Sequence, residues 1–211
     1  MDKAISVHNL LHKKYRKLEF SGEWEEAFGH PGAFGSWFVY GMSSNGKSSF
    51  VHKLAKYLAE LGKTVDYISL EEGADDTIQD AARRAGWDKV GNKIRIREPL
   101  SFDKFCEIVK KPKSADVFVI DTVQYFGGVD FERYYELRVS HPNKLFVYVS
   151  HVDGKLPDGK VAVQLMRDSK LKIWVEGFRA QSKGRYIGRT GYYTVWEERA
   201  TKYYDKDAIK E

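Results

Sequence analysis

The chain has 211 residues, a length typical of one globular domain. Hydrophobic residues make up 42% of it and charged residues 31%, a composition that supports a packed core and excludes global disorder. The single cysteine, Cys106, excludes an internal disulfide and a zinc site built from cysteines. The formal net charge of +5 permits an anionic partner such as nucleic acid but does not by itself indicate one.

The apolar runs of the chain are short. Residues 117–120 and 145–149 are examples, and neither could span a bilayer, which needs about 20 residues. The first 17 residues lack the continuous apolar centre and the small-residue cleavage site of a secretion signal. We therefore expect a cytoplasmic protein that has no membrane partner.

The N-terminal residues 3–18 interleave apolar positions with Lys and His, which predicts a basic amphipathic helix. Two interpretations of this helix stay open: it packs on its own domain, or it is an arm that docks on a neighbouring subunit. We expect an arm over residues 1–20, one globular domain over residues 21–200 and a tail over residues 201–211.

Beyond a Gly- and Pro-containing loop at residues 28–35, apolar strands alternate with segments of helical period. The predicted strands are residues 36–41, 64–70, 93–98, 115–121 and 144–151. The predicted helices are residues 48–62, 75–86 and 101–111. Most of these strands are solid apolar runs, so both faces of the sheet are expected to be covered. The pattern predicts an α/β fold with a mostly parallel central sheet flanked by helices.

The last third of the chain has a different pattern. Three segments rich in β-formers are separated by Gly and polar residues: residues 172–180, 184–188 and 192–198. This arrangement predicts a C-terminal antiparallel hairpin extension of the sheet.

One motif carries specific chemistry. Residues 41–48 read GMSSNGKS and match G-x-x-x-x-G-K-[ST], between a predicted strand and a predicted helix. Glycines let the backbone curl so that its N–H groups point at a phosphate, and the following helix adds its positive end. Lys47 then reaches the β- and γ-phosphates, and the Ser48 hydroxyl contacts Mg²⁺. The motif predicts ATP and Mg²⁺ binding, with the nucleotide held by Gly41, Ser43, Ser44, Asn45, Gly46, Lys47, Ser48 and Ser49.

Hydrolysis of ATP needs carboxylates beside the phosphates. Asp121 follows four apolar residues at the end of a strand, where it is predicted to serve the Mg²⁺ ion together with Ser48. Glu71 and Glu72 end another strand, and one of them is predicted to orient or deprotonate the attacking water. We favour Glu71, with Glu72 as the alternative.

Four segments, in this order, resemble the RecA-like ATPase core, in particular its RadA/DnaB branch. They are the P-loop at 41–48, ISLEEG at 68–73, IDTVQ at 120–124 and VSHVDGK at 149–155. A fifth, SKGRYIG at 182–188, resembles the Lys-x-Arg segment that this branch inserts into the ATP site of the next subunit. Together the matches span roughly residues 20–197.

The resemblance implies a homo-oligomer, a ring or a filament, with ATP at the subunit interfaces. It implies that Glu71 activates water, that Asp121 lies beside Mg²⁺ and that His151 senses the γ-phosphate. Lys183 and Arg185 would act in trans on the neighbouring ATP site, where an added cation stabilises transition-state charge.

The resemblance also implies single-stranded DNA as a partner, in replication, recombination or repair. The loops after the third and fourth strands, residues 125–143 and 152–169, would face the DNA, and Lys155, Lys160 and Arg167 would contact its phosphates. The chain lacks the zinc-finger cysteines of RadA proteins, so we expect a minimal core for which helicase activity does not follow.

Two other functions stay open. One is an ATP-switched loader or adaptor that acts on a partner protein, for which the basic N-terminal helix is the supporting feature. The other is a P-loop kinase of small molecules, which needs an arginine-rich lid. Arg83 and Arg84 are candidates for such a lid, but the path from the P-loop helix to SLEEG fits the RecA arrangement better.

Overall fold

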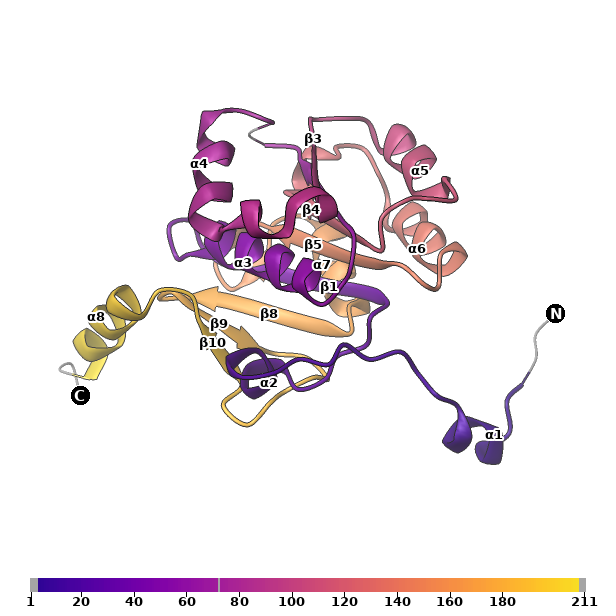
Figure 1. Cartoon of the computed structure of the whole chain (residues 1–211), viewed down its shortest axis with the longest axis horizontal. Helices are drawn as coiled ribbons and strands as arrows, with labels where there is room; N and C mark the ends of the chain where they lie inside the picture. The colour runs from indigo at the N-terminus through magenta and orange to yellow at the C-terminus, as the bar shows by residue number, and fades with distance from the viewer. Residues whose placement is uncertain (1–3, 72, 209–211) are drawn as a thin grey trace.

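The computed structural model describes residues 4–71 and 73–208, with side chains as far as residue 205 (Figure 1). Its main sheet has eight strands in the order β10-β9-β8-β1-β5-β4-β2-β3 among these residues. The strands are β1 (Gly35–Tyr40), β2 (Val65–Ser69), β3 (Ile94–Arg97), β4 (Val117–Asp121), β5 (Leu145–Ser150), β8 (Leu171–Glu176), β9 (Arg179–Ser182) and β10 (Tyr192–Thr194). All pairings are parallel except those of β9 and β10, which confirms the predicted parallel sheet with an antiparallel C-terminal extension.

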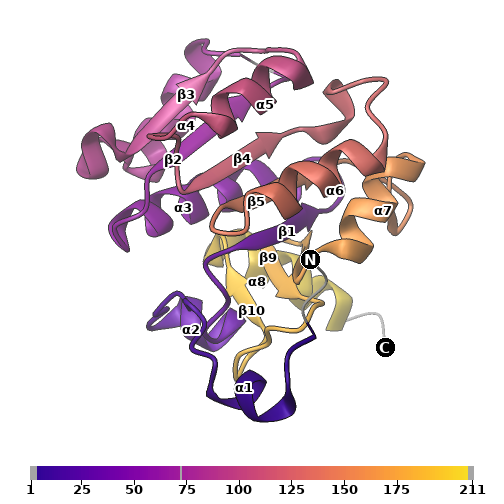
Figure 2. The same cartoon turned by 90° about the vertical axis from the view of Figure 1, so that its right-hand side faces the viewer.

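Helices lie on both sides of this sheet (Figure 2). The helices of the described residues are α1 (Val7–His12), which lies apart from the sheet, α2 (Glu23–Phe28), α3 (Lys47–Glu60), α4 (Asp76–Ala85), α5 (Phe102–Lys110), α6 (Phe131–Ser140), α7 (Lys160–Asp168) and α8 (Glu197–Ala208). Shorter elements are the 3-10 turns η1 (Trp87–Lys93) and η2 (Val123–Tyr125) and the hairpin of β6 (Val152–Asp153) with β7 (Leu156–Pro157).

Two hydrophobic clusters, one on each face, explain why the strands read as solid apolar runs. All six residues of β1 are buried. Trp37 and Val39 belong to the cluster that α3 covers, whereas Phe38 and Tyr40 belong to the cluster that α5, α6 and α7 cover. Because successive side chains of a strand point to opposite faces, a strand covered on both sides is expected to be mostly apolar.

The parallel strands bring distant segments of the chain to one edge of the sheet. Tyr40 pairs with Ser150 and with Trp174, and Ser69 pairs with Asp121, at or beside the carboxyl ends of five strands. The segments that follow these strand ends therefore meet at this edge. In open α/β sheets, this is the edge at which ligands bind.

The N-terminal helix is much shorter than predicted. The pattern over residues 3–18 predicted one helix, but α1 covers six residues and buries none of them. After it the chain is extended, with a bridge between Lys17 and Gly32, and buries Leu18 and Phe20, which are two residues apart as in a strand. An isolated short helix gains no packing energy, so nothing extends α1 further. Figure 1 shows α1 lying away from the body of the protein.

Two segments predicted as loops contain secondary structure. Residues 125–143 include α6, and residues 152–169 form the β6–β7 hairpin followed by α7. Each helix buries only two residues, in α7 Ala162 and Leu165, so the helical period is weak in the sequence. Residues 184–188, predicted as part of the extension, are not a strand. Helix α8 crosses residue 200, where the boundary between domain and tail was expected.

Candidate nucleotide-binding site

The P-loop connects β1 to α3, and close packing demands its two glycines. A Cβ atom on Gly41 would lie 2.2 Å from the carbonyl oxygen of Val175. Gly46 caps α3 in the left-handed conformation with φ 91°, and a Cβ there would lie 3.0 Å from the Phe178 ring. The loop is thus pressed against the carboxyl end of β8, and larger residues at either position would displace it.

The two-residue turn between β8 and β9 braces the P-loop. The backbone N–H of Gly177 donates to Asn45 Oδ1 at 2.8 Å, and that of Phe178 donates to the Asn45 carbonyl at 3.1 Å. Phe178 has φ 60°, a strained conformation for a residue with a side chain. The side chain of Asn45, predicted to hold the nucleotide, is therefore engaged in shaping the loop.

Lys47 lies across the loop with its side chain largely buried. Its Nζ donates to the carbonyl of Gly41 at 3.2 Å. Burial lowers the pKa of Lys47, while the charges of Asp121 and Glu71 oppose that shift. The ammonium group therefore lies near Glu71, the predicted water-activating residue, and Asp121, the predicted Mg²⁺ ligand.

A polar cluster joins the ends of β2, β4 and β5. Asp121 accepts hydrogen bonds from the Tyr67 hydroxyl and, at 3.1 Å, from the Thr122 hydroxyl. Burial raises the pKa of Asp121, partly offset by these two hydrogen bonds. The Thr122 hydroxyl also lies 3.3 Å from Glu71 Oε2, and His151 Nε2 lies 3.3 Å from the same oxygen. Thr122 was missed in the sequence, although it directly follows Asp121.

Most of these groups line one cavity of about 400 Å³, which we call the phosphate cavity; Gly41, Asn45 and Tyr67 lie outside its lining. Its lining comprises Ser43, Ser44, Gly46, Lys47, Ser48, Ser49, Glu71, Asp121, Thr122, His151, Phe178, Trp196 and Arg199. The structure thus brings Glu71, Asp121 and His151 to the P-loop, whereas Glu72 lies outside the described residues. Three further lining residues, Phe178, Trp196 and Arg199, carried no signal in the sequence because they come from the C-terminal extension and α8.

The finger residues Lys183 and Arg185, which are predicted to act in trans, do not reach this cavity. The backbone N–H of Lys183 donates to the carbonyl of Lys172 at 2.8 Å, and that of Arg185 donates to the carbonyl of Lys170 at 3.2 Å. Both partners lie at or just before the amino end of β8, whereas the P-loop packs on its carboxyl end. Lys183 and Arg185 are exposed there, at the opposite edge of the sheet from their own cavity.

The residues predicted to contact DNA also lie outside the phosphate cavity. Lys155 is in the turn of the β6–β7 hairpin, and Lys160 and Arg167 are on α7. All three are exposed. The hairpin is held to the site by Gln124, whose Nε2 donates to Ser150 Oγ at 2.7 Å and to the carbonyl of Asp158 at 2.9 Å.

The donor set fits Mg²⁺ better than a tightly ligated transition metal. Ser48 and Asp121 offer a hydroxyl and a carboxylate to one cavity, and Mg²⁺ prefers oxygen ligands while keeping several waters. Over residues 4–71 and 73–205, no group of three His, Cys, Asp or Glu side chains could hold a metal ion. Within the described part of the chain, no helix has the length and apolarity to cross a membrane.

No protein-family model matches the chain, and no curated protein matches it in sequence. Solved structures do match. FlaH, a flagellar accessory protein from Methanocaldococcus jannaschii, is 14% identical with a TM-score of 0.59, over 85% of this chain and 92% of FlaH. A KaiC-like protein from Pyrococcus horikoshii OT3 is 16% identical with a TM-score of 0.60, over 85% of this chain and 98% of its own.

A third solved structure, an ATPase domain, is 12% identical with a TM-score of 0.52, over 80% of this chain and 84% of that domain. At such identities the likeness concerns the fold alone. It agrees with the strand order and with the P-loop at the carboxyl edge of β1. The chain has a RecA-like P-loop fold, which confirms the fold expected from its motifs.

Proposed function

We propose that this protein binds ATP with Mg²⁺ in the phosphate cavity and hydrolyses it. One observation carries the proposal: the P-loop, Lys47, Glu71, Asp121 and His151 line a single cavity although they come from four separate segments. A glycine-rich turn that arose by chance would not be accompanied by these carboxylates.

The geometry supports a division of roles. Ser48 and Asp121 would hold the Mg²⁺ ion, and Lys47 would neutralise charge on the β- and γ-phosphates. The Glu71 side chain is 39% exposed, so a water molecule can reach it, and its contact with His151 orients it. Glu71 then orients or deprotonates the attacking water. His151 directly precedes the β6–β7 hairpin and passes the state of the γ-phosphate to it.

We further propose that the active site is completed by a neighbouring subunit of a homo-oligomer. Lys183 and Arg185 are exposed at the opposite edge of the sheet, so they are available to a neighbour's phosphate cavity. A head-to-tail interface joins two different faces of the same protein, which is what a ring or filament requires. The two cations would stabilise the charge of the transition state.

Single-stranded DNA is the partner that we propose for the assembly. Lys155, Lys160 and Arg167 are exposed on the hairpin and α7, and Gln124 ties this region to the end of β4. We propose that these cations respond to the state of the phosphate cavity while they contact DNA phosphates. The loader and the small-molecule kinase are the alternatives.

The rate of ATP hydrolysis, measured with and without single-stranded DNA at fixed low salt, tests this proposal. Stimulated turnover, together with an ATP-dependent increase in size, is the expected result. Assembly without any response to DNA would favour the loader. Phosphate transfer to a nucleoside or a sugar would favour the kinase. Because phosphate contacts are salt-dependent, the stimulation should fall as salt rises.

A further inference from the structure

A second cavity adjoins the phosphate cavity and has no role in the function proposed above. It has a volume of about 460 Å³ and lies between α3, α4 and the segment that follows β10. Ser49 and Trp196 line both cavities. We propose that this second cavity takes the nucleoside half of the bound triphosphate, with Trp196 as a stacking surface for the base; the inference rests on the proposed function.

One face of α3 connects the phosphate cavity with the second cavity. Ser49, His52 and Lys53 are three and four residues apart, so they share one face of the helix, and all three line the second cavity. A triphosphate held at the amino end of α3 reaches this face through Ser49. The nucleoside attached to its α-phosphate then enters a space whose volume lies in the range of small-molecule sites.

The ring of Trp196 is held in place by a neighbouring cation, and part of the ring stays open. The Arg199 guanidinium lies 4.2 Å from the centroid of the Trp196 ring, and the Phe178 ring meets Trp196 edge-on at 6.2 Å. The residue is nevertheless 47% exposed. An aromatic ring fixed by a cation and open towards a cavity is suited to stacking on a nucleobase.

The rest of the wall of the second cavity carries polar and charged groups that could contact a ligand. Lys53 Nζ donates to the Val195 carbonyl at 2.7 Å, which fixes the segment beside Trp196. His52 is 6% exposed, and its Nε2 has no hydrogen-bond partner among the described residues. Buried polar atoms in proteins almost always have a partner, so an unpaired nitrogen in a cavity wall points to a missing ligand or water. The charged side chains that also face the cavity are Glu23, Arg84 and Glu197.

The experiment compares two ligands, ATP and inorganic tripolyphosphate, by calorimetric titration in the presence of Mg²⁺. Two variants probe the second cavity. Trp196→Ala removes the stacking surface, and Ala81→Arg places a long side chain into the cavity from the partly exposed face of α4. Tyr135→Ala is the matched control, because Tyr135 is a 46% exposed aromatic residue on α6, outside both cavities.

The wild type should bind ATP more tightly than tripolyphosphate. Each cavity variant should lose roughly tenfold in ATP affinity, the loss expected for one base stacked on an aromatic ring, and keep its affinity for tripolyphosphate. The control should match the wild type. The inference is overturned if the wild type binds both ligands equally, if the variants bind ATP normally, or if they lose both ligands in parallel. Failure of the wild type to bind either ligand would instead remove the proposed function.

Discussion

Lys47 shows how the fold itself positions a single residue of the P-loop. Its ammonium group is buried against the Gly41 carbonyl and faces Asp121 and Glu71. Lys47→Ala should therefore lower the affinity for ATP on the order of 100-fold, since it removes the charge-assisted contact with the phosphates. Titration with an ATP analogue measures this. Lys113→Ala, at an exposed position away from the cavity, should bind normally.

Glu71 is the residue on which the proposed chemistry depends. Glu71→Gln keeps the size of the side chain and an oxygen that can contact Thr122, but it removes the base. The variant should bind ATP like the wild type and hydrolyse it on the order of 100-fold more slowly. Single-turnover hydrolysis measures the chemical step, with Glu132→Gln on the exposed surface of α6 as control. Full activity of Glu71→Gln would transfer the role to Glu72.

The burial of His52 should make the free energy of unfolding depend on pH. Burial, and to a smaller extent the charge of Arg84, lowers its pKa from 6.5 to about 4. The unfolded chain therefore binds a proton at His52 that the folded chain does not, and stability falls as the pH drops from 6.5 towards 4. The loss is roughly 3 kcal/mol at the acid limit. Urea unfolding of the wild type and of His52→Phe should diverge over this pH range; parallel curves would contradict the assignment.

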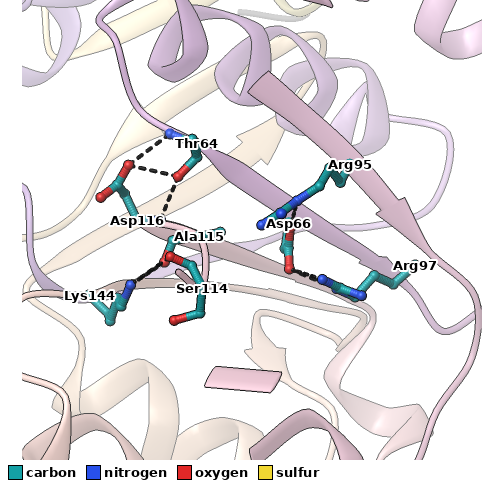
Figure 3. Close-up of polar contacts among 8 residues, drawn as sticks. All are labelled: Thr64, Asp66, Arg95, Arg97, Ser114, Ala115, Asp116 and Lys144. Atoms are coloured by element: carbon teal, nitrogen blue, oxygen red, sulfur yellow. Dashed lines mark hydrogen bonds and ion pairs between the residues drawn. The ribbon is translucent and has the colours of Figure 1, made fainter. Parts of the chain in front are cut away.

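At the scale of elements, a buried carboxylate holds the edge strand β3 in register. Asp66 on β2 is fully buried and bonds Arg95 Nε at 2.7 Å and an Arg97 nitrogen at 2.6 Å (Figure 3). Strands β2 and β3 are parallel, and β3 has no other neighbour in the sheet that the described residues form. Two cations on one strand, both paired with a single anion on the next, fix the register of β3.

Asp66→Ala should therefore lower the free energy of unfolding by about 2 kcal/mol. The loss stays this small because the two arginines are partly exposed and can turn to water. Urea denaturation measures the loss. Asp80→Ala breaks an exposed ion pair with Arg83 on α4 and should change stability little. Equal effects of the two substitutions would show that burial of Asp66 does not matter.

The amino ends of the central strands are tied by a second network. The Thr64 backbone N–H and hydroxyl donate to Asp116 Oδ2 at 2.9 and 2.8 Å (Figure 3). Lys144 Nζ donates to the carbonyls of Ser114 and Ala115 at 2.9 and 2.7 Å. These contacts join the starts of β2, β4 and β5. Fixing the starts of parallel strands also fixes where their carboxyl ends lie, and hence the positions of the site residues.

Elements with local signals were predictable from the sequence. Each of these signals occupies a few consecutive residues: the apolar run of β1, the glycines of the P-loop and the serine cap of α5. The Ser101 hydroxyl does accept a hydrogen bond from the Lys104 N–H. The extent of α1 was not predictable, because burial of Leu18 and Phe20 decides it. Helix α6 buries little and was missed, although Asp130 caps it.

The residues of the site also differ in how far the sequence predicts them. The P-loop, Glu71, Asp121 and His151 each follow a predicted strand, so they could be identified from the sequence. Phe178, Trp196 and Arg199 reach the phosphate cavity because the β8–β9 turn bonds Asn45 and because α8 packs on that turn. No spacing in the sequence expresses such contacts between distant segments.

For the whole molecule, the position of the Lys183–Arg185 segment is the central feature. The phosphate cavity opens at one edge of the sheet, and the two cations are exposed at the other. An isolated subunit thus holds the predicted parts of two half-sites, which a head-to-tail assembly would join. Arg185→Ala should keep nucleotide binding in the isolated subunit and lose turnover in the assembly, by analogy with fingers worth about 10³–10⁵ in rate.

The most direct test mixes two inactive variants and measures the rate of ATP hydrolysis. Lys47→Ala subunits keep the finger but lose the phosphate site, and Arg185→Ala subunits keep the site but lose the finger. Each alone should be inactive, and an equal mixture should recover about a quarter of the wild-type rate, since a quarter of head-to-tail interfaces then pair an intact site with an intact finger. A mixture that stays inactive, or Arg185→Ala subunits that hydrolyse ATP at the full rate, would contradict an ATPase site shared between subunits.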